Sequence, residues 1–259
     1  MDKSHRLIQS QISNLISTGN FDKLIEVIDA IIDLNDDKLM IAANKALANA
    51  ENLSSLIIGI CKDSDKLNKT IAGSYYHENG FHKIVLLSGK QFKLRLHHFG
   101  VSAKIPMENI HDHRWNFTST IINGNLKMDL FRPTEKTTDA EKVYHFIYES
   151  EKSNGNYSTE YVSEAHLIKS ESRIYRPGDT YLMKTHELHR IRNSSGEESM
   201  TLILTGKPIS SKCNLFSRRP ILEEEKMTVA YEREKMIEML ENVCEKICPN
   251  KMYNHVYSY

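Results

Sequence analysis

The sequence lacks an excess of charge of either sign. Its 259 residues include 34 Lys and Arg against 34 Asp and Glu, so the formal net charge is zero. Proteins that bind nucleic acid mainly through its phosphates carry a basic surface, so nucleic acid is not an expected partner. Hydrophobic residues make up 40% and charged residues 26%, which is typical of a globular protein and excludes wholesale disorder.

Long apolar runs and cysteines are also scarce. Stretches such as 55–61 and 201–205 are far shorter than the roughly 18 residues that span a bilayer, so no membrane partner is expected. The four cysteines lie at positions 61, 213, 244 and 248, a spacing that matches neither a zinc ribbon nor a secreted disulfide framework. Since the first residues also lack the apolar segment of a secretory signal, we expect a cytoplasmic location.

The hydrophobic pattern divides the chain into three parts. Over 1–71, apolar residues recur every three or four positions and predict a helical N-terminal segment, either a cap on the rest of the protein or a docking surface. Over 72–218 the period changes to two, and turn signals separate many short strands, which is typical of a closed or double-sheet β architecture. Residues 219–259 form a predicted C-terminal helix, from Leu222 to Cys248, and a tail.

The individual elements follow from the same pattern. An aspartate at position 36 or 37 can cap the third N-terminal helix, and a fourth helix is expected to follow Asn52. The expected strands cover 83–87, 92–99, 116–122, 126–131, 143–149, 158–163, 164–170, 180–184, 189–193 and 200–205.

Two histidines two residues apart give the first chemical signal. On an extended strand His111 and His113 point to the same face. Neutral imidazoles on one side of a β pocket suit Zn, Fe, Cu or Ni. By itself such a pair is more often a surface or packing pair, but a second histidine-containing stretch at 178–193 strengthens the metal hypothesis.

These two stretches resemble the motifs of the cupin superfamily. The first cupin motif is HxH, three or four residues, usually a Glu, then six residues and a Gly. His111, His113 and Gly124 fit it, and Phe117 stands where the Glu would be. The resemblance covers about residues 83–206. It implies a mainly β fold, a cupin-type double-stranded β-helix (jelly roll) barrel with flanking helices.

The second cupin motif begins with Gly and ends with a His followed by an Asn four residues later. Gly178, His189 and Asn193 fall in register, whereas Lys184 and His186 replace its Pro and second Gly. The resemblance therefore implies His189 as a third metal ligand beside the HxH pair.

Within the cupins, the segments 110–113 and 188–193 are similar to the cysteine dioxygenase (thiol dioxygenase) branch. That branch binds Fe(II) through three histidines and no carboxylate, which matches the missing Glu. The resemblance implies Fe(II) held by His111, His113 and His189, with Zn, Ni or Cu as the other candidates. It further implies an oxygenase that uses O2 on a small polar metabolite, for example an amino acid or a thiol-related compound. Cupins often pair, so a homodimer is a further expectation.

The sequence also departs from that branch. Its Ser-x-His-x-Tyr run after the last ligand corresponds to the segment from Thr201 to Thr205, and its carboxylate-binding Arg falls near His77. Cysteine itself is therefore a doubtful substrate. A zinc-dependent lyase or isomerase and a non-catalytic metabolite-binding cupin remain as alternatives.

Alternation along 92–99 supplies further candidates. If Arg95, His97 and Phe99 line the barrel, Arg95 can hold a carboxylate and His97 can exchange a proton. In the opposite interpretation, Leu94 and Leu96 fill the core and Arg95 lies in solvent. His186 is interpreted as an acid or base near the metal, as a fourth ligand, or as an exposed loop residue, and Tyr181 as a pocket residue. The remaining candidates for substrate contact are Trp115, Phe117, Met183, Thr201 and Thr205.

Overall fold

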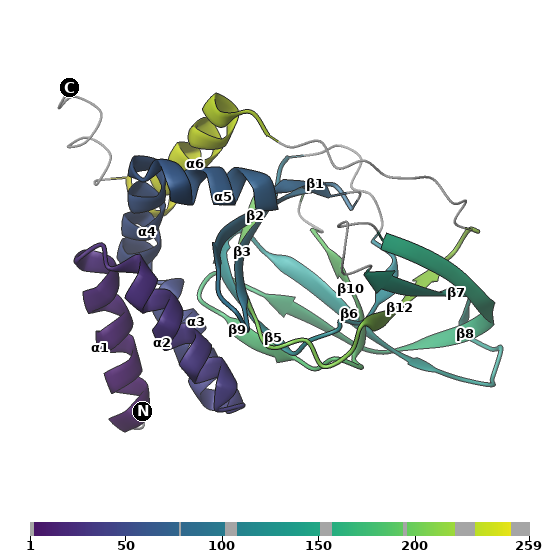
Figure 1. The fold of residues 1–259 in the computed structure, drawn as a ribbon. Coiled ribbons are helices and arrows are strands. Elements are labelled where there is room, and N and C mark those ends of the chain that lie inside the picture. Colours follow the sequence, from purple (N-terminus) through teal and green to yellow (C-terminus); the bar gives the residue numbers. More distant parts are fainter. Residues whose placement is uncertain are drawn as a thin grey trace.

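The computed structural model describes residues 3–77, 79–101, 108–150, 157–193, 196–220 and 231–249. In this part of the chain, helices precede the strands, and one further helix follows them (Figure 1). The N-terminal helices are α1 (Lys3–Ser17), α2 (Phe21–Asp33), α3 (Asp37–Leu47), α4 (Ala50–Lys62) and α5 (Ser64–Gly73). The C-terminal helix α6 spans Arg233–Ile247; its expected beginning at Leu222 lies outside the described residues.

Side-chain caps fix where the N-terminal helices begin. Asp36 caps α3 by accepting from the backbone N–H groups of its first turn. Asn49 caps α4, so this helix begins at Ala50 and not after Asn52 as expected. Helix α5, capped by Asp63, was not expected, because few of its side chains are buried and its apolar signal is weak.

The strands form two antiparallel sheets. They are β1 (Tyr75–His77), β2 (Phe81–Ser88), β3 (Lys93–Phe99), β4 (Ile110–His111), β5 (Phe117–Asn123), β6 (Leu126–Pro133), β7 (Glu141–Ser150), β8 (Tyr157–Tyr175), β9 (Thr180–Met183), β10 (Leu188–Arg192), β11 (Ser199–Thr205) and β12 (Lys212–Ser217). The first sheet has the order β1-β2-β3-β11-β5-β9, and the second, β10-β4-β12-β7-β8-β6, closes on itself. The chain thus has the expected double-stranded β-helix fold with flanking helices.

One expectation about the strands was wrong. The ranges 158–163 and 164–170 belong to a single strand, β8, which pairs with both β6 and β7. Its register shifts against each neighbour at a bulge. A bulge interrupts the alternation of side chains without ending the strand, which explains why the pattern suggested two pieces. Strands β1 and β12 were not expected, because they are short or carry few apolar residues. The extended strand expected to carry both His111 and His113 ends at His111 as β4, so His113 lies in the segment after it.

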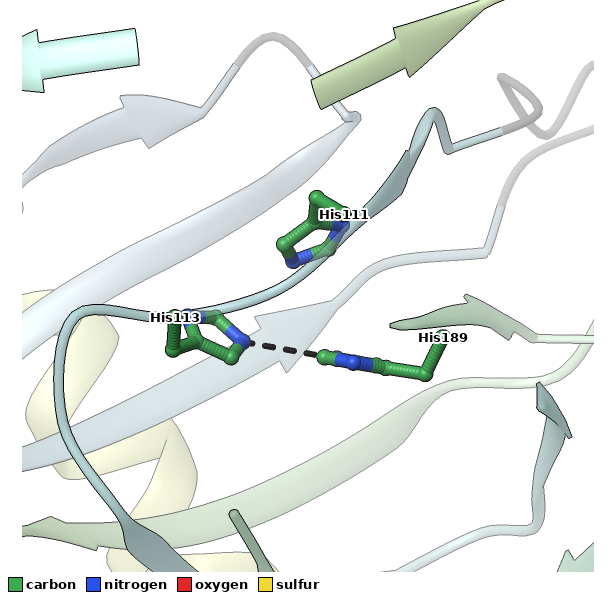
Figure 2. A group of neighbouring side chains, drawn as sticks. All are labelled: His111, His113 and His189. Carbon is green, nitrogen blue, oxygen red and sulfur yellow. Dashed lines mark hydrogen bonds between the residues drawn. The ribbon is translucent and has the colours of Figure 1, made fainter. Parts of the chain in front are cut away.

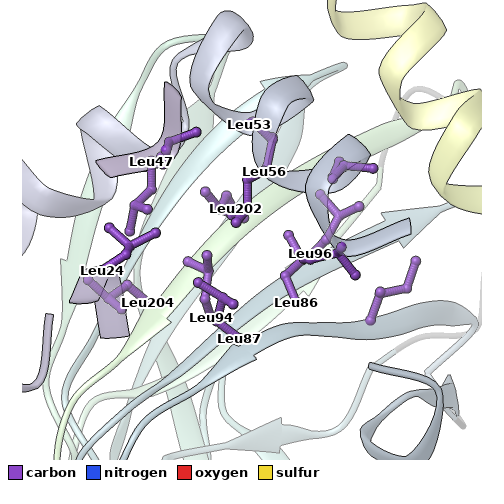
Figure 3. Packing of buried hydrophobic residues seen from close by; sticks show 14 of the residues in the cluster. Leu24, Leu47, Leu53, Leu56, Leu86, Leu87, Leu94, Leu96, Leu202 and Leu204 are labelled. Carbon is purple, nitrogen blue, oxygen red and sulfur yellow. The ribbon is translucent and has the colours of Figure 1, made fainter. Parts of the chain in front are cut away.

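The helices cover one face of the first sheet and share a core with it. Figure 3 shows leucines of the helices and of strands β2, β3 and β11 meeting in this layer. The labelled residues are Leu24, Leu47, Leu53, Leu56, Leu86, Leu87, Leu94, Leu96, Leu202 and Leu204. Helix α6 contributes apolar residues to the same core. Among the described helices, none is both long and apolar enough to cross a membrane.

This packing determines which way the side chains of β3 point. Leu94 and Leu96 are fully buried against the helices. Successive side chains of a strand alternate between faces, so Arg95, His97 and Phe99 lie on the opposite, inner face of the sheet. The interpretation that placed Arg95 in solvent was wrong, because both faces of this sheet are covered.

Candidate metal centre

Two strands of the second sheet and the segment that follows β4 bring three histidines together. His111 is the last residue of β4 and pairs in register with His189 of β10, and His113 follows two residues later. One ring nitrogen from each residue can be chosen so that all three lie within 4.8 Å of one another. Figure 2 shows the three rings facing a common centre, with the contact between His113 and His189 drawn as a dashed line.

The backbone orients two of these rings. The Nδ1 of His111 lies 2.9 Å from the carbonyl oxygen of Asn109, and the Nδ1 of His189 lies 3.1 Å from that of Glu187. A carbonyl oxygen only accepts, so each neutral ring carries its proton on Nδ1. The Nε2 lone pair of each is then available to a metal ion, an arrangement common among metal-binding histidines.

The third ring completes the donor set. The Nε2 atoms of His113 and His189 are 3.4 Å apart. Two neutral imidazole nitrogens at this distance need either a shared proton or a cation near both lone pairs. The three residues therefore fit a metal ion that prefers imidazole nitrogen.

Burial keeps two of the rings neutral. Together with repulsion from His111, it lowers the pKa of His189 to about 3. Burial also holds the pKa of His113 well below its usual range, with added repulsion from the other two histidines and from Arg95. Since neutral imidazole is the form that binds metal, protons do not compete for these two donors near neutral pH.

Phe117 occupies the place of the usual glutamate. Its buried ring lies 4.7 Å from that of His113 and 6.2 Å from that of His189, measured between centroids. Among the described residues the donor set is thus three imidazoles without a carboxylate, and an apolar ring shields one side of it.

Polar contacts hold the segment around His113 in place. The carboxylate of Asp112 accepts two hydrogen bonds of 2.6 Å from Asn214 of β12, one from the backbone and one from the side chain. The backbone N–H of His113 donates to the carbonyl of Thr185, whose own N–H donates to the side chain of Asn116. The turn between β9 and β10 is in this way joined to the HxH segment.

The candidates from β3 lie on the same side as the histidines. The guanidinium of Arg95 is 4.9 Å from the ring centre of Trp115, which in turn lies 6.3 Å from the ring of His113. The ring of His97 stacks on Phe81 at 4.5 Å, and Phe99 packs on the same Phe81 ring at 4.8 Å.

Most remaining candidates belong to one apolar cluster beside the centre. Tyr181 and Met183 are buried there with Phe117, and burial raises the pKa of the Tyr181 phenol. Thr201 is buried opposite His97 in the sheet, whereas the hydroxyl of Thr205 accepts a 2.8 Å hydrogen bond from the backbone of β3.

His186 lies apart from this cluster. Its side chain is exposed in the turn between β9 and β10, and it is not among the described residues whose ligand atoms gather at the centre. Of the three interpretations, the structure agrees with the exposed loop residue.

Two residues near the centre were missed. The buried carboxylate of Glu108 accepts hydrogen bonds from the backbone of Ile191 (2.6 Å) and the side chain of Asn79 (2.9 Å), and burial raises its pKa. No pattern marked it, because it precedes the HxH segment. Lys83 shares the inner face of the sheet, which its alternation with Ile84 could have indicated.

Comparisons with known proteins give a likeness of fold only. No family model matches the chain, and no curated protein matches it. A cupin of the RmlC-like type from Shewanella frigidimarina is 10% identical, over 52% of this chain and 82% of that one, with a TM-score of 0.32. A protein with a double-stranded β-helix domain from Klebsiella pneumoniae is 14% identical, over 56% and 92%, with a TM-score of 0.32.

A hydroquinone 1,2-dioxygenase from Sphingomonas sp. TTNP3, solved with 4-hydroxybenzoate, is 8% identical over 50% of this chain and 66% of that one, with a TM-score of 0.30. Likeness at this level carries no functional argument. The strand order and the three histidines of the chain itself define a double-stranded β-helix fold with a candidate metal centre.

Proposed function

We propose that the protein is a mononuclear non-haem Fe(II) oxygenase, dioxygenase-like, that acts on a small polar metabolite. The observation that carries the proposal is the donor set of His111, His113 and His189, which is neutral and contains no carboxylate. Resemblance of the two motifs to the thiol dioxygenase branch favours iron over zinc. Cysteine itself is disfavoured as substrate, because the segment from Thr201 to Thr205 lacks the His and Tyr of that branch and has Ile203 and Thr205 in their places.

When bound, Fe(II) would supply redox chemistry with O2 and a centre of positive charge that attracts an anionic donor atom of the substrate. A neutral ligand set leaves that charge undiminished. The rings of Trp115 and Phe117 exclude water on one side of the histidines. Tyr181 keeps its phenol proton because burial raises its pKa, so it can donate a hydrogen bond but cannot serve as an anion. Burial and the neighbouring cations hold the pKa of His97 well below its usual range, so its ring stays neutral and can contact the substrate as a hydrogen-bond donor or acceptor.

A zinc-dependent lyase or isomerase is the second candidate. The observation that favours it is the same donor set, since three histidines also suit a catalytic zinc ion with an open position. A metabolite-binding cupin without catalysis is the third. We further propose that the protein is cytoplasmic, binds a small molecule and forms a homodimer.

The metal content of the purified protein tests the proposal. We expect near-stoichiometric iron by elemental mass spectrometry after purification without a metal resin, and oxygen uptake with some member of a panel of small metabolites. The variant His189→Ala should lose the iron. His186→Ala is the matched control, since it removes an exposed histidine from the same turn, and it should keep the iron.

Other outcomes would redirect the proposal. Stoichiometric zinc that resists exchange for iron would favour the lyase or isomerase. Absence of bound metal from the wild type, even after incubation with Fe(II) or Zn²⁺, would contradict both metal-dependent functions and favour a binding role.

A further inference from the structure

Three cationic side chains gather on the inner face of the first sheet, beside the metal centre. Arg95 and Arg114 each place a guanidinium carbon 4.9 Å from the ring centre of Trp115. Lys83 lies on the neighbouring strand, where its backbone pairs with His97 while Val85 pairs with Arg95. Lys83 and Arg95 therefore lie diagonally across the two paired strands, on the same face of the sheet.

Lys83 is the cation whose position most needs an explanation. Its ammonium group donates a 2.7 Å hydrogen bond to the phenol oxygen of Tyr75 and lies 4.7 Å from the centre of that ring. A phenol oxygen accepts this hydrogen bond without being an ordinary counter-ion for an ammonium group. Burial lowers the pKa of Lys83, and among the described residues the cations Arg95, Lys93 and Arg114 lower it further. A positive group placed among positive groups is stabilised by a bound anion.

His97 supplies an independent observation. Its Nε2 atom is buried and has no hydrogen-bond partner among the residues that the structure describes. A buried polar atom without a partner is uncommon in folded proteins and points to a ligand or water.

We propose that Lys83 and Arg95 form a subsite for the carboxylate of an organic-acid substrate, with His97 as an additional polar contact. The inference rests on the proposed function, because the second donor group of the same acid would reach the metal. Arg matches a carboxylate with two parallel N–H donors and a full charge, and Lys adds a third donor, whose charged form a bound carboxylate would favour. The metal and the two cations would then select an anion that carries a metal-binding group at some distance from its carboxylate.

A series of probes with one carbon skeleton tests the subsite. Succinate, succinamate and succinamide carry two, one and no negative charges. Binding is followed by calorimetry and by the fluorescence of Trp115, the only tryptophan of the sequence, in metal-free and zinc-loaded protein. We expect succinamate to bind metal-free protein at least about tenfold more tightly than succinamide, since a hydrogen bond to a charged group contributes that much or more.

Substitutions of single side chains test which residues bind the anion. Lys83→Met and Arg95→Met should each weaken succinamate binding about tenfold or more, while Lys83→Arg, which keeps the charge, should stay within about threefold. Lys90→Met is the matched control, because it removes the same charge from an exposed position in the turn between β2 and β3, and it should change binding less than about twofold. Far-UV circular dichroism verifies that each variant is folded.

Two results would overturn the subsite: equal binding of succinamate and succinamide, or an equal loss in Lys90→Met and Lys83→Met. The second would mean that the charge of the whole molecule, and not these side chains, attracts the anion. Failure of the proposed function is distinguishable. Charge-selective binding without oxygen uptake would support the subsite and contradict the oxygenase function. Oxygen uptake without charge-selective binding would support the oxygenase function and contradict the subsite.

Discussion

At the scale of single residues, His189 illustrates how burial sets the chemistry of a side chain. It is 2% exposed, and its Nδ1 is held by the carbonyl of Glu187. With a pKa of about 3, the ring stays neutral over the whole range in which a free histidine titrates. The same burial that makes it a good metal donor therefore lowers the stability of the folded protein in acid.

The pH dependence of stability follows from this. An unfolded histidine takes up its proton near pH 6.5, whereas folded His189 does so only near pH 3. Between these values the unfolded chain binds the extra proton, so the free energy of unfolding of the metal-free protein falls as pH drops through this window. We expect the urea midpoint to fall more between pH 7.5 and 5.5 in the wild type than in His189→Gln.

His186→Gln is the control for this measurement, since it replaces an exposed histidine of the same turn, and it should follow the wild type. Equal losses in the wild type and in His189→Gln would contradict the assigned burial cost.

At the scale of elements, the site depends on how the strands are joined. The turn after β9 and the segment after β4 are linked by hydrogen bonds between His113, Thr185 and Asn116. The turn between β5 and β6 is equally constrained, because Gly124 has a φ of +69° and sits against the backbone of Glu198 and Ser199. Such a close approach of two chain segments leaves no room for a Cβ atom.

Substitutions at two glycines can separate the cost of an unfavourable φ from the cost of a steric overlap. Gly178 also has a positive φ, +89°, but a Cβ there would meet nothing within 4 Å. We expect Gly178→Ala to lower the free energy of unfolding by about 1–2 kcal/mol through φ alone. Gly124→Ala should cost at least about 1 kcal/mol more, because it adds the overlap with the carbonyl of Glu198. Urea denaturation measures both, and similar costs would show that the turn shifts freely.

At the scale of the whole molecule, the helices and the first sheet share one hydrophobic core. Leu56 of α4 and Leu202 of β11 are fully buried in the same core, and the Asn44 side chain of α3 donates to the carbonyl of Leu202 at 3.2 Å. The helical segment is thus part of what keeps the inner face of the sheet in place.

Cooperative unfolding can be observed with two probes. Circular dichroism at 222 nm reports mainly on the helices, and the fluorescence of Trp115 reports on the barrel. We expect coincident transitions in urea. Leu202→Ala should shift both together, at a cost of about 2–5 kcal/mol for a buried leucine. Helices that unfold separately from the Trp115 signal would contradict the shared core.

Local features of the sequence were sufficient for part of this description. The change of period from 3.6 to 2 located the helical and β parts, and the HxH spacing with the second motif identified His111, His113 and His189. These signals are local: strand alternation puts residues two apart on one face, and motif spacing is read along the chain. The sequence could also show that Phe117 replaces a carboxylate.

The tertiary structure decided the rest. Alternation along β3 allowed two orientations, and only the helices packed on Leu94 and Leu96 turned Arg95 and His97 toward the metal centre. Strand β8 is continuous because bulges preserve its pairing with β6 and β7 where the side-chain pattern breaks. Each of these outcomes depends on contacts between segments far apart in the chain. A local pattern limits the faces that a side chain can occupy, but packing on both sides of a sheet selects one of them.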